Sequence, residues 1–275
     1  MRKRSLPTGW YPDNSQEIYT MLESWKKKWG DYHSEACAGI VPHAGWMFSG
    51  EIAAFIMHCI DKNIETLVIV GGHLPAGAGI LAAFEEEYET PLGLLQGDAS
   101  FLYELRKKIT IQEDLFQDNT VEIQLPLVKA VFPNIAIVWL RVEQTGNAVK
   151  LGKTLYEVAL KLNRRIGVLG STDLTHYGRN YGFAPKGRGE NAVSWVKNTN
   201  DKRFIDALTE LRIEDALNLA VSEKSACSAG GAAAAAAFSV ENGVTKGTLE
   251  VYRTSYDIYP DESFVGYAGI AYYKE

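Results

Sequence analysis

The sequence predicts a layered α/β protein folded as one domain over residues 1–275, and three observations carry this prediction. Short apolar segments with strand character alternate with longer segments of helical periodicity along the chain, which is typical of a sheet covered by helices. No proline- or serine-rich linker divides the 275 residues, and no internal repeat emerges. The 46% hydrophobic and 23% charged residues are the balance of a globular protein that buries a large core without disulfides.

The first half of the chain supplies four helices and two strands to this prediction. Polar residues 13–15 cap a helix that reaches about Lys28, with Ile18, Leu22 and Trp25 on its apolar face. Apolar runs predict buried strands at 38–41 and 66–70. Further helices are expected at 51–60, 99–108 and 121–132.

The second half continues the alternation. Strands are expected at 135–142 and 166–170, around a helix at 148–162. Later segments predict helices at 191–208, 213–221 and 229–240, and then strands at 249–256 and 264–273. Residues 178–189 are rich in Gly, Arg and Lys and indicate a surface loop. The alanine run at 232–237 allows a helix to pack closely on a sheet.

Charge and cysteine content exclude several classes of protein. The net charge is −6, and the basic runs 2–4 and 26–28 are short and isolated, whereas a nucleic-acid-binding protein needs a positive face. The longest stretch of small and apolar residues, 229–238, is far shorter than the roughly 20 residues that span a bilayer. Three cysteines are too few for a disulfide framework and favour the reducing cytoplasm. We therefore expect a cytoplasmic protein with no nucleic-acid partner and no membrane segment.

Three of the five histidines share one sequence context. His43, His73 and His176 each follow a predicted strand and stand in a glycine-flanked loop. In open α/β sheets, ligands bind in the crevice beyond the carboxyl ends of the strands. A single histidine is more often structural, but three in equivalent positions predict a shared site. His33 and His58 lack this context.

Imidazole at this place indicates a metal site. Imidazole binds Zn, Cu, Fe and Ni, and a thiolate narrows the choice towards Cu, Zn or Fe. Cys227 lies just ahead of the predicted helix at 229–240, where a helix start lowers the pKa of a thiol. We therefore expect a depressed pKa for Cys227, although a buried small residue is the simpler interpretation of it alone. Cys37 and Cys59 are expected to be structural.

Two acidic residues lie near these positions, Asp173 with two interpretations and Glu122 with one. Asp173 and His176 are three residues apart, so a helical turn would place both on one face, where the carboxylate could orient a general base. Alternatively, Asp173 caps the turn. Glu122 opens a predicted amphipathic helix and is expected to act as a cap at its positive end.

Other enzyme signatures are absent from the sequence. It lacks the P-loop, the Gly-x-Ser-x-Gly elbow, and the Cys-x-x-Cys and His-Glu-x-x-His spacings. Gly71 and Gly72 follow a strand but lack the third glycine of a dinucleotide fingerprint, so a turn that presents His73 is the better interpretation.

Several of these segments resemble those of the MEMO family, also called AmmeMemoRadiSam system protein B, in their residues and in their order along the chain. The resemblance spans about residues 9–268 and is carried by 9–12 (GWYP), 41–50 (VPHAGWMFSG), 90–93 (TPLG), 122–126 (EIQLP), 171–178 (STDLTHYG), Cys227 and 263–268 (SFVGYA).

The resemblance implies a single three-layer α/β/α domain with a central mixed sheet, like that of the extradiol ring-cleaving dioxygenases. His43 and His73 match the two imidazole ligands of the iron in that superfamily, and Cys227 matches the third ligand. His176, with Asp173 beside it, matches the pocket histidine that acts as acid and base. The implied cofactor is Fe(II), with Cu or Zn as alternatives.

Two positions depart from the family pattern. Asn119 stands where the family usually has a histidine, and Leu74 stands where many relatives have a second histidine after His73. Asparagine cannot shuttle a proton near neutral pH. Two hypotheses therefore stand: a metal-dependent redox enzyme acting on a small organic molecule, or a binding protein that keeps the pocket for a metal or a peptide without turnover. The sequence leaves the oligomeric state open.

Overall fold

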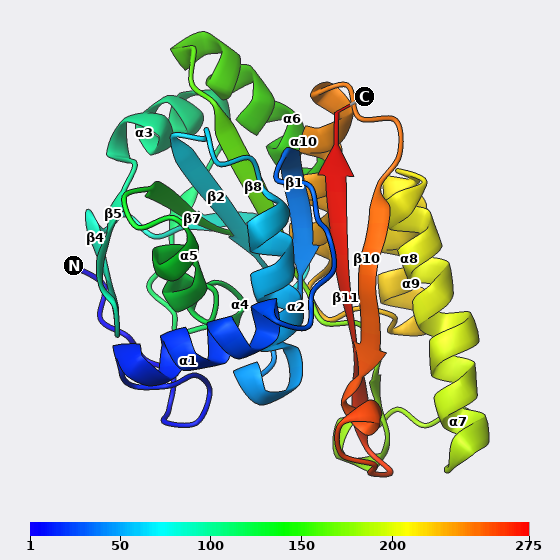
Figure 1. The fold of residues 1–275 in the computed structure, drawn as a ribbon. Helices are drawn as coiled ribbons and strands as arrows, with labels where there is room; N and C mark the ends of the chain where they lie inside the picture. Colours follow the sequence, from blue (N-terminus) through cyan, green and yellow to red (C-terminus); the bar gives the residue numbers. More distant parts are fainter. Residues whose placement is uncertain (275) are drawn as a thin grey trace.

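Four parallel strands form the centre of the sheet in the computed structural model of this protein, which describes residues 1–274 (Figure 1). In spatial order they are β1 (Ala36–Val41), β8 (Ile166–Ser171), β2 (Thr66–Gly71) and β7 (Ala136–Val142). Neighbouring strands in this group are parallel. Their carboxyl ends therefore lie along one edge of the sheet, as the sequence predicts.

Shorter and antiparallel strands extend the sheet on both sides, so that it is mixed, as expected. On one side, β11 (Phe264–Tyr273) runs antiparallel to β1, and β10 (Thr248–Thr254) runs antiparallel to β11. On the other side, β3 (Ile80–Ala82) runs antiparallel to β7. The remaining strands within residues 1–274 are β4 (Glu87–Thr90), β5 (Gly93–Gly97), β6 (Gln112–Glu113) and β9 (His176–Tyr177).

Helices cover both faces of the sheet and complete a three-layer α/β/α domain. One face carries α1 (Ser15–Lys26), α2 (Trp46–Cys59), α4 (Asn119–Glu122) and α5 (Leu125–Val131). The other carries α3 (Ala99–Lys108), α6 (Gly146–Leu162), α8 (Asp201–Thr209), α9 (Ile213–Glu223) and α10 (Ala229–Glu241). The short α7 (Glu190–Trp195) lies at the far end of this layer (Figure 1).

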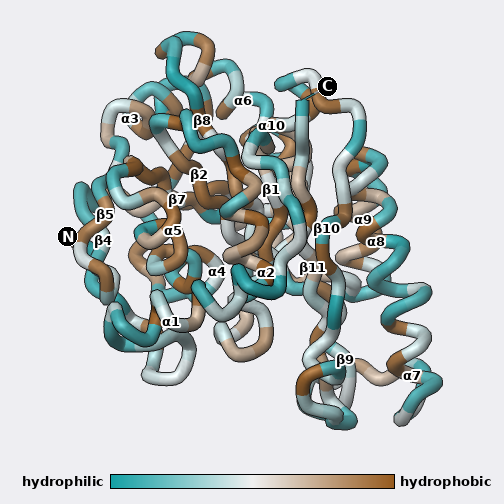
Figure 2. Tube along the Cα trace, in the orientation of Figure 1, coloured by the Kyte–Doolittle hydropathy of each residue, from teal (hydrophilic) through white to brown (hydrophobic). Residues whose placement is uncertain are grey.

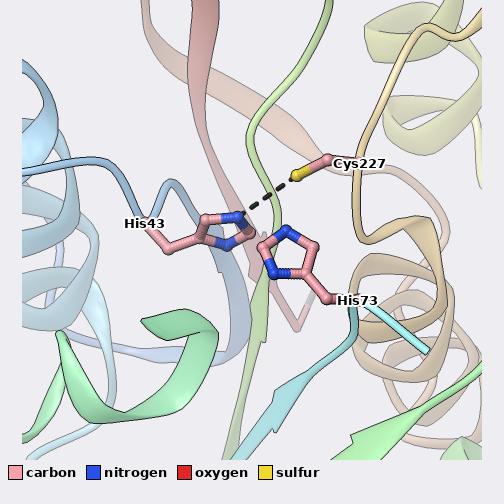
Figure 3. Close-up of side chains that lie close together, drawn as sticks. All are labelled: His43, His73 and Cys227. Atoms are coloured by element: carbon pink, nitrogen blue, oxygen red, sulfur yellow. Dashed lines mark hydrogen bonds between the residues drawn. The ribbon is translucent and has the colours of Figure 1, made fainter. Parts of the chain in front are cut away.

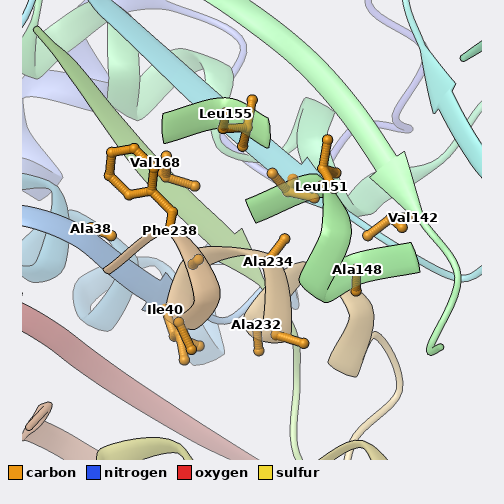
Figure 4. Packing of buried hydrophobic residues seen from close by; sticks show 14 of the residues in the cluster. Ala38, Ile40, Val142, Ala148, Leu151, Leu155, Val168, Ala232, Ala234 and Phe238 are labelled. Carbon is orange, nitrogen blue, oxygen red and sulfur yellow. The ribbon is translucent and has the colours of Figure 1, made fainter. Parts of the chain in front are cut away.

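Alternation along the central strands separates two apolar cores. In β2, Val68 and Val70 belong to the core beneath α6 and α10, whereas Leu67 and Ile69 belong to the core beneath α2 and α5. Burial on both faces explains why these strands are continuous apolar runs rather than alternating patterns (Figure 2). Figure 4 shows the first core, where the alanines of α10 pack between the sheet and α6.

Two predicted helix boundaries are wrong for identifiable reasons. The helix expected to start at Glu51 starts at Trp46, because Gly50 is a close packing position and not a break: a Cβ there would lie 2.8 Å from the Trp25 ring. The helix expected at 121–132 is divided into α4 and α5. Its break is stabilised by a hydrogen bond from Trp46 Nε1 to the carbonyl of Ile123, and Pro126 lies in the first turn of the second helix.

Other differences concern short or irregular segments. The predicted helix at 191–208 contains a π-helical turn at Val196–Asn200 between α7 and α8. The predicted strand at 249–256 ends at Thr254, where a capping box with Asp257 starts a 3₁₀ turn. Strands of two to five residues give too little periodicity to be predicted. Within residues 1–274, no helix has the length and apolar character needed to cross a membrane.

Candidate metal centre

The loops after β1, β2 and β8 bring the predicted histidines to one crevice. His43 follows β1, His73 follows β2, and the segment containing Asp173 and His176 follows β8. Because β8 lies between β1 and β2, these three loops are neighbours. The strand-end argument therefore predicts their spatial proximity correctly, and the crevice lies where ligands bind in open α/β sheets.

Glycines bring Cys227 to the same crevice. A Cβ on Gly231 would lie 2.3 Å from the carbonyl oxygen of Val70, and one on Gly230 would lie 2.5 Å from that of Val142. The first turn of α10 therefore packs directly on the strand ends. A Cβ on Gly72 would similarly lie 2.2 Å from Ser228 Oγ. Only glycines allow the segment before α10 to approach the loop that holds His73.

The side chains of His43, His73 and Cys227 form the cluster shown in Figure 3. One ligand atom from each residue lies within 4.8 Å of the other two. His43 Nε2 lies 3.2 Å from Cys227 Sγ, and the two imidazole rings are nearly perpendicular, with centroids 4.9 Å apart. Ligands of one tetrahedral ion lie about 3.5 Å apart, given metal–ligand distances of about 2.0–2.3 Å. The cluster therefore has the dimensions of a mononuclear metal site.

His43 is held in the orientation that a metal ligand needs. It is 1% exposed, and its Nδ1 lies 3.1 Å from Ser171 Oγ, which leaves Nε2 facing the cluster. Its backbone N–H donates to Asp173 Oδ1 at 2.7 Å. Burial lowers the pKa of His43 to about 4. The imidazole is therefore neutral at pH 7, which is the form that binds metals.

A chain of charged groups orients His73. Its Nδ1 lies 3.1 Å from Asp118 Oδ2, and that carboxylate also contacts Arg141, which pairs with the buried Asp114. Burial favours the neutral acid, but hydrogen bonds from His73 and Thr120, together with Arg141, lower the pKa of Asp118. A carboxylate behind a histidine is a common device for orienting a metal ligand. Sequence analysis missed Asp118 and Arg141, because only the fold brings Arg141 of β7 beside the loop after β2.

The expected low pKa of Cys227 is wrong. Burial and the charge of Asp173 raise the pKa of the Cys227 thiol well above its ordinary value. The helix start is too distant to compensate, because α10 begins at Ala229. The backbone N–H of Cys227 donates to the carbonyl oxygen of Asp173, so the packing that assembles the cluster also surrounds the thiol. A thiol in such a setting loses its proton when it coordinates a cation.

Asp173 and His176 meet in the crevice, but not on a helix. Residues 172–175 form a loop without regular secondary structure, and His176 begins β9. His176 Nε2 lies 3.8 Å from Asp173 Oδ2 and has no hydrogen-bond partner within residues 1–274. The His176 ring contacts the ring of Tyr181, with centroids 4.9 Å apart. Asp173 is not a turn cap of its own segment, since it accepts the backbone N–H of His43.

Two other predicted positions have structural roles. Asn119 lines the crevice and donates from Nδ2 to the carbonyl oxygen of His43 at 3.0 Å. Glu122 does not cap its helix, because Asp118 is the N-cap of α4. Its carboxylate instead accepts the backbone N–H groups of Ser5 and Leu6, and so binds the amino-terminal segment to the domain.

A cavity of about 450 Å³ opens above the cluster, within the range typical of small-molecule sites. Its walls include His43, His73, Asp173 and His176 together with five aromatic side chains. The Cys and His residues expected to be structural lie outside the crevice. Cys37 and Cys59 are buried in the cores, and His58 is buried against Trp29.

These features define an α/β protein with a candidate His/His/Cys centre at the carboxyl ends of the parallel strands of a mixed sheet. The chain belongs to the Memo-like protein family, whose family model matches residues 2–271. It is 29% identical to a MEMO1 family protein of Thermococcus onnurineus and to another of Pyrococcus furiosus, each over the full length of both chains. A relative from Nitrosopumilus maritimus is 28% identical over 99% of both chains. The sequence resemblance to this family is confirmed.

A solved structure shares the fold at low sequence identity. It is that of an uncharacterized protein from Escherichia coli K12, with a TM-score of 0.57 and 13% identity over 85% of this chain and 98% of the other. At this identity the likeness concerns the fold alone. The expected relation to extradiol dioxygenases stays a prediction.

Proposed function

We propose that this protein is a metal-dependent oxidoreductase that acts on a small organic molecule, with one metal ion held by His43, His73 and Cys227. The observation that carries the proposal is the convergence of these three ligand atoms within 4.8 Å, beside an open cavity that His43 and His73 line. Three protein ligands leave a coordination position free for substrate, as in catalytic metal sites.

The donor set supports the choice of metal. Two imidazole nitrogens and a thiolate suit Fe(II), Cu and Zn, and they do not suit Mg or Ca, which prefer oxygen ligands. We propose Fe(II) as the native ion, because the family resemblance aligns these residues with iron ligands, and Cu or Zn as alternatives. Such an ion supplies a binding position for an oxygen atom of the substrate and a route for electron transfer.

In this proposal His176 exchanges a proton with the substrate, and Asp173 positions it. His176 lines the cavity beside the cluster, and its Nε2 atom is buried and has no hydrogen-bond partner within residues 1–274. Asp173 lies close to both histidine rings, with its Oδ2 3.9 Å from His43 Nε2 and 3.8 Å from His176 Nε2. A carboxylate in this place can fix the orientation of the imidazole that exchanges the proton.

One observation favours the second hypothesis, a binding protein for a metal or peptide without turnover. Asn119 lines the cavity with an amide that already donates a hydrogen bond to the backbone of His43. Because an amide does not titrate, the cavity has one titrating group fewer than the family pattern. We also propose that the protein is located in the cytoplasm. The three cysteines are free thiols, as is usual in that reducing compartment.

Elemental analysis after anaerobic purification tests the metal centre. We expect about one metal ion per chain, and loss of that ion in His43→Ala and in Cys227→Ala, because two remaining ligands hold a divalent ion weakly. His33→Ala is the matched control, since this exposed histidine lies outside the cluster. Equal metal content in all four proteins would refute the site.

A further inference from the structure

The walls of the cavity above the cluster carry negative but no fixed positive charge. Within residues 1–274, two carboxylates line it, Asp173 and Asp261, and no lysine or arginine does. Of the guanidinium groups near it, that of Arg141 is 3% exposed and is paired with Asp114 and Asp118, and that of Arg253, which acts on Tyr267, is paired with Glu51. An anionic ligand would therefore meet repulsion from the walls, and a cationic one would be attracted.

Aromatic rings surround the same space. They belong to Trp10, Phe48, Tyr181, Tyr259 and Tyr267. Tyr259 and Tyr181 are 68% and 45% exposed and stand at the mouth, whereas Tyr267 is buried. The faces of such rings attract ammonium groups as well as apolar groups. The lining thus combines the two features that recognise an organic cation.

Asp261 is placed at the mouth by its own loop. Its Oδ1 accepts the backbone N–H of Ser263 at 3.0 Å, and Ser263 Oγ accepts the backbone N–H of Asn180 at 3.2 Å. The loop is thereby attached to the segment that carries Tyr181. Burial, followed by the charges of Asp173 and Asp261, raises the pKa of Tyr181, so this phenol lies within the field of both carboxylates.

We propose that the cavity selects small organic molecules that carry a protonated amine, with Asp261 and the mouth tyrosines as the cation subsite. The amine would lie at the mouth, and the opposite, reacting end would point to His176 and the cluster. This inference rests on the proposed function for the identity of the reacting end, but the subsite itself uses no metal ligand.

A matched pair of probes tests the subsite. 2-Phenylethylamine and 3-phenylpropionate have the same ring and the same linker length and differ in the charge of the terminal group. We expect the amine to bind the metal-stripped protein at least about tenfold more tightly than the carboxylate, by calorimetry or ligand-observed NMR. Asp261→Asn should remove most of this preference, and Tyr259→Leu should weaken amine binding about threefold.

Glu262→Gln is the control, because it removes the same charge one residue away. Glu262 is exposed, pairs with Arg188 and does not line this cavity. We expect this variant to keep the wild-type preference. Equal binding of both probes, a preference unchanged in Asp261→Asn, or no binding of either probe at millimolar concentration would overturn the subsite.

The titration is repeated after the protein is incubated with Zn, and the metal that the protein retains is measured. The two readouts separate this inference from the proposed function. A protein that prefers the amine but holds no metal would support the subsite and refute the metal centre. A protein that holds metal and shows no amine preference in its stripped form would refute the subsite alone.

Discussion

His73 has a backbone φ of 56°, a conformation that costs free energy in any residue with a side chain. The residue keeps this conformation because its neighbours fix it. Gly71 and Gly72 pack against Thr120 and Ser228, and its imidazole contacts Asp118. The left-handed turn directs the ring back towards His43 and not along the strand. Strain at a side chain with this chemistry is typical of functional positions.

Exchange of a single side chain distinguishes metal binding from turnover. His176→Ala should keep the metal, because His176 is not one of the clustered ligands. It should lower oxygen uptake with an oxidisable substrate by about a hundredfold or more, the usual contribution of a general acid or base. Metal analysis and an oxygen electrode on the Fe(II)-loaded protein measure both quantities.

Asn119→His serves as the complementary variant and should raise uptake, because it restores a titrating group to the cavity wall. Wild-type uptake that His176→Ala leaves unchanged would contradict the assigned role. Metal-loaded wild type and Asn119→His without any uptake would favour the binding protein over the enzyme.

At the scale of elements, the sequence predicts those parts of the site that lie in the loops after the parallel strands. The strands that precede His43, His73 and Asp173 are continuous apolar runs, and parallel strands place their loops on one edge. The same argument fails for Cys227, because its environment depends on Asp173, which is 54 residues away in the chain. Local pattern predicts a helix start and the lowered pKa that goes with it, whereas tertiary burial produces the opposite shift.

The approach of α10 to the loop after β2 gives a prediction at this scale. A methyl group in Gly72→Ala would overlap Ser228 Oγ, 2.2 Å away, and push the segment that carries Cys227 from the cluster. We expect a loss of about 1–3 kcal/mol in stability and a weaker affinity for metal. Thermal unfolding and metal titration measure the two effects.

Gly146→Ala provides the control for this variant. Gly146 is in the first turn of α6 and has no atom within 4 Å of an added Cβ. Its replacement should leave metal affinity unchanged and stabilise the fold slightly. If Gly72→Ala binds metal as tightly as Gly146→Ala, the close approach of α10 does not determine the position of Cys227.

Across the whole molecule, a buried polar network behind the crevice connects the helical layer to the sheet. Asp201 is fully buried at the start of α8, just after the π-helical turn, and accepts hydrogen bonds from Thr175 N at 3.1 Å and Tyr252 Oη at 2.8 Å. Gly266 of β11 makes room for it, since a Cβ there would overlap the carboxylate. This network holds the loop between Asp173 and His176. Sequence patterns do not reveal it, because an aspartate beside a helix normally indicates a solvated cap.

The titration of Asp201 should make stability depend on pH. Burial raises its pKa from 3.8 to about 7, against the lowering effect of its bonds to Thr175 and Tyr252 and of nearby His176. Between about pH 4 and 7 the unfolded chain loses this proton while the folded protein keeps it, so stability falls as pH rises. The slope is at most about 1.4 kcal/mol per pH unit. Above pH 7 the contribution is constant.

Urea unfolding of the metal-stripped protein at pH 5, 6, 7 and 8 measures this effect by comparison with Asp201→Asn. Asparagine resembles the protonated acid and does not titrate, so the variant should gain stability relative to wild type as pH rises to about 7. Asp206→Asn is the control, because Asp206 lies at the surface of the same helix and pairs with Lys202. Its stability should remain parallel to that of wild type. Parallel curves for wild type and Asp201→Asn would show that Asp201 is already ionised in the folded protein, stabilised by Thr175 and Tyr252 against the cost of burial.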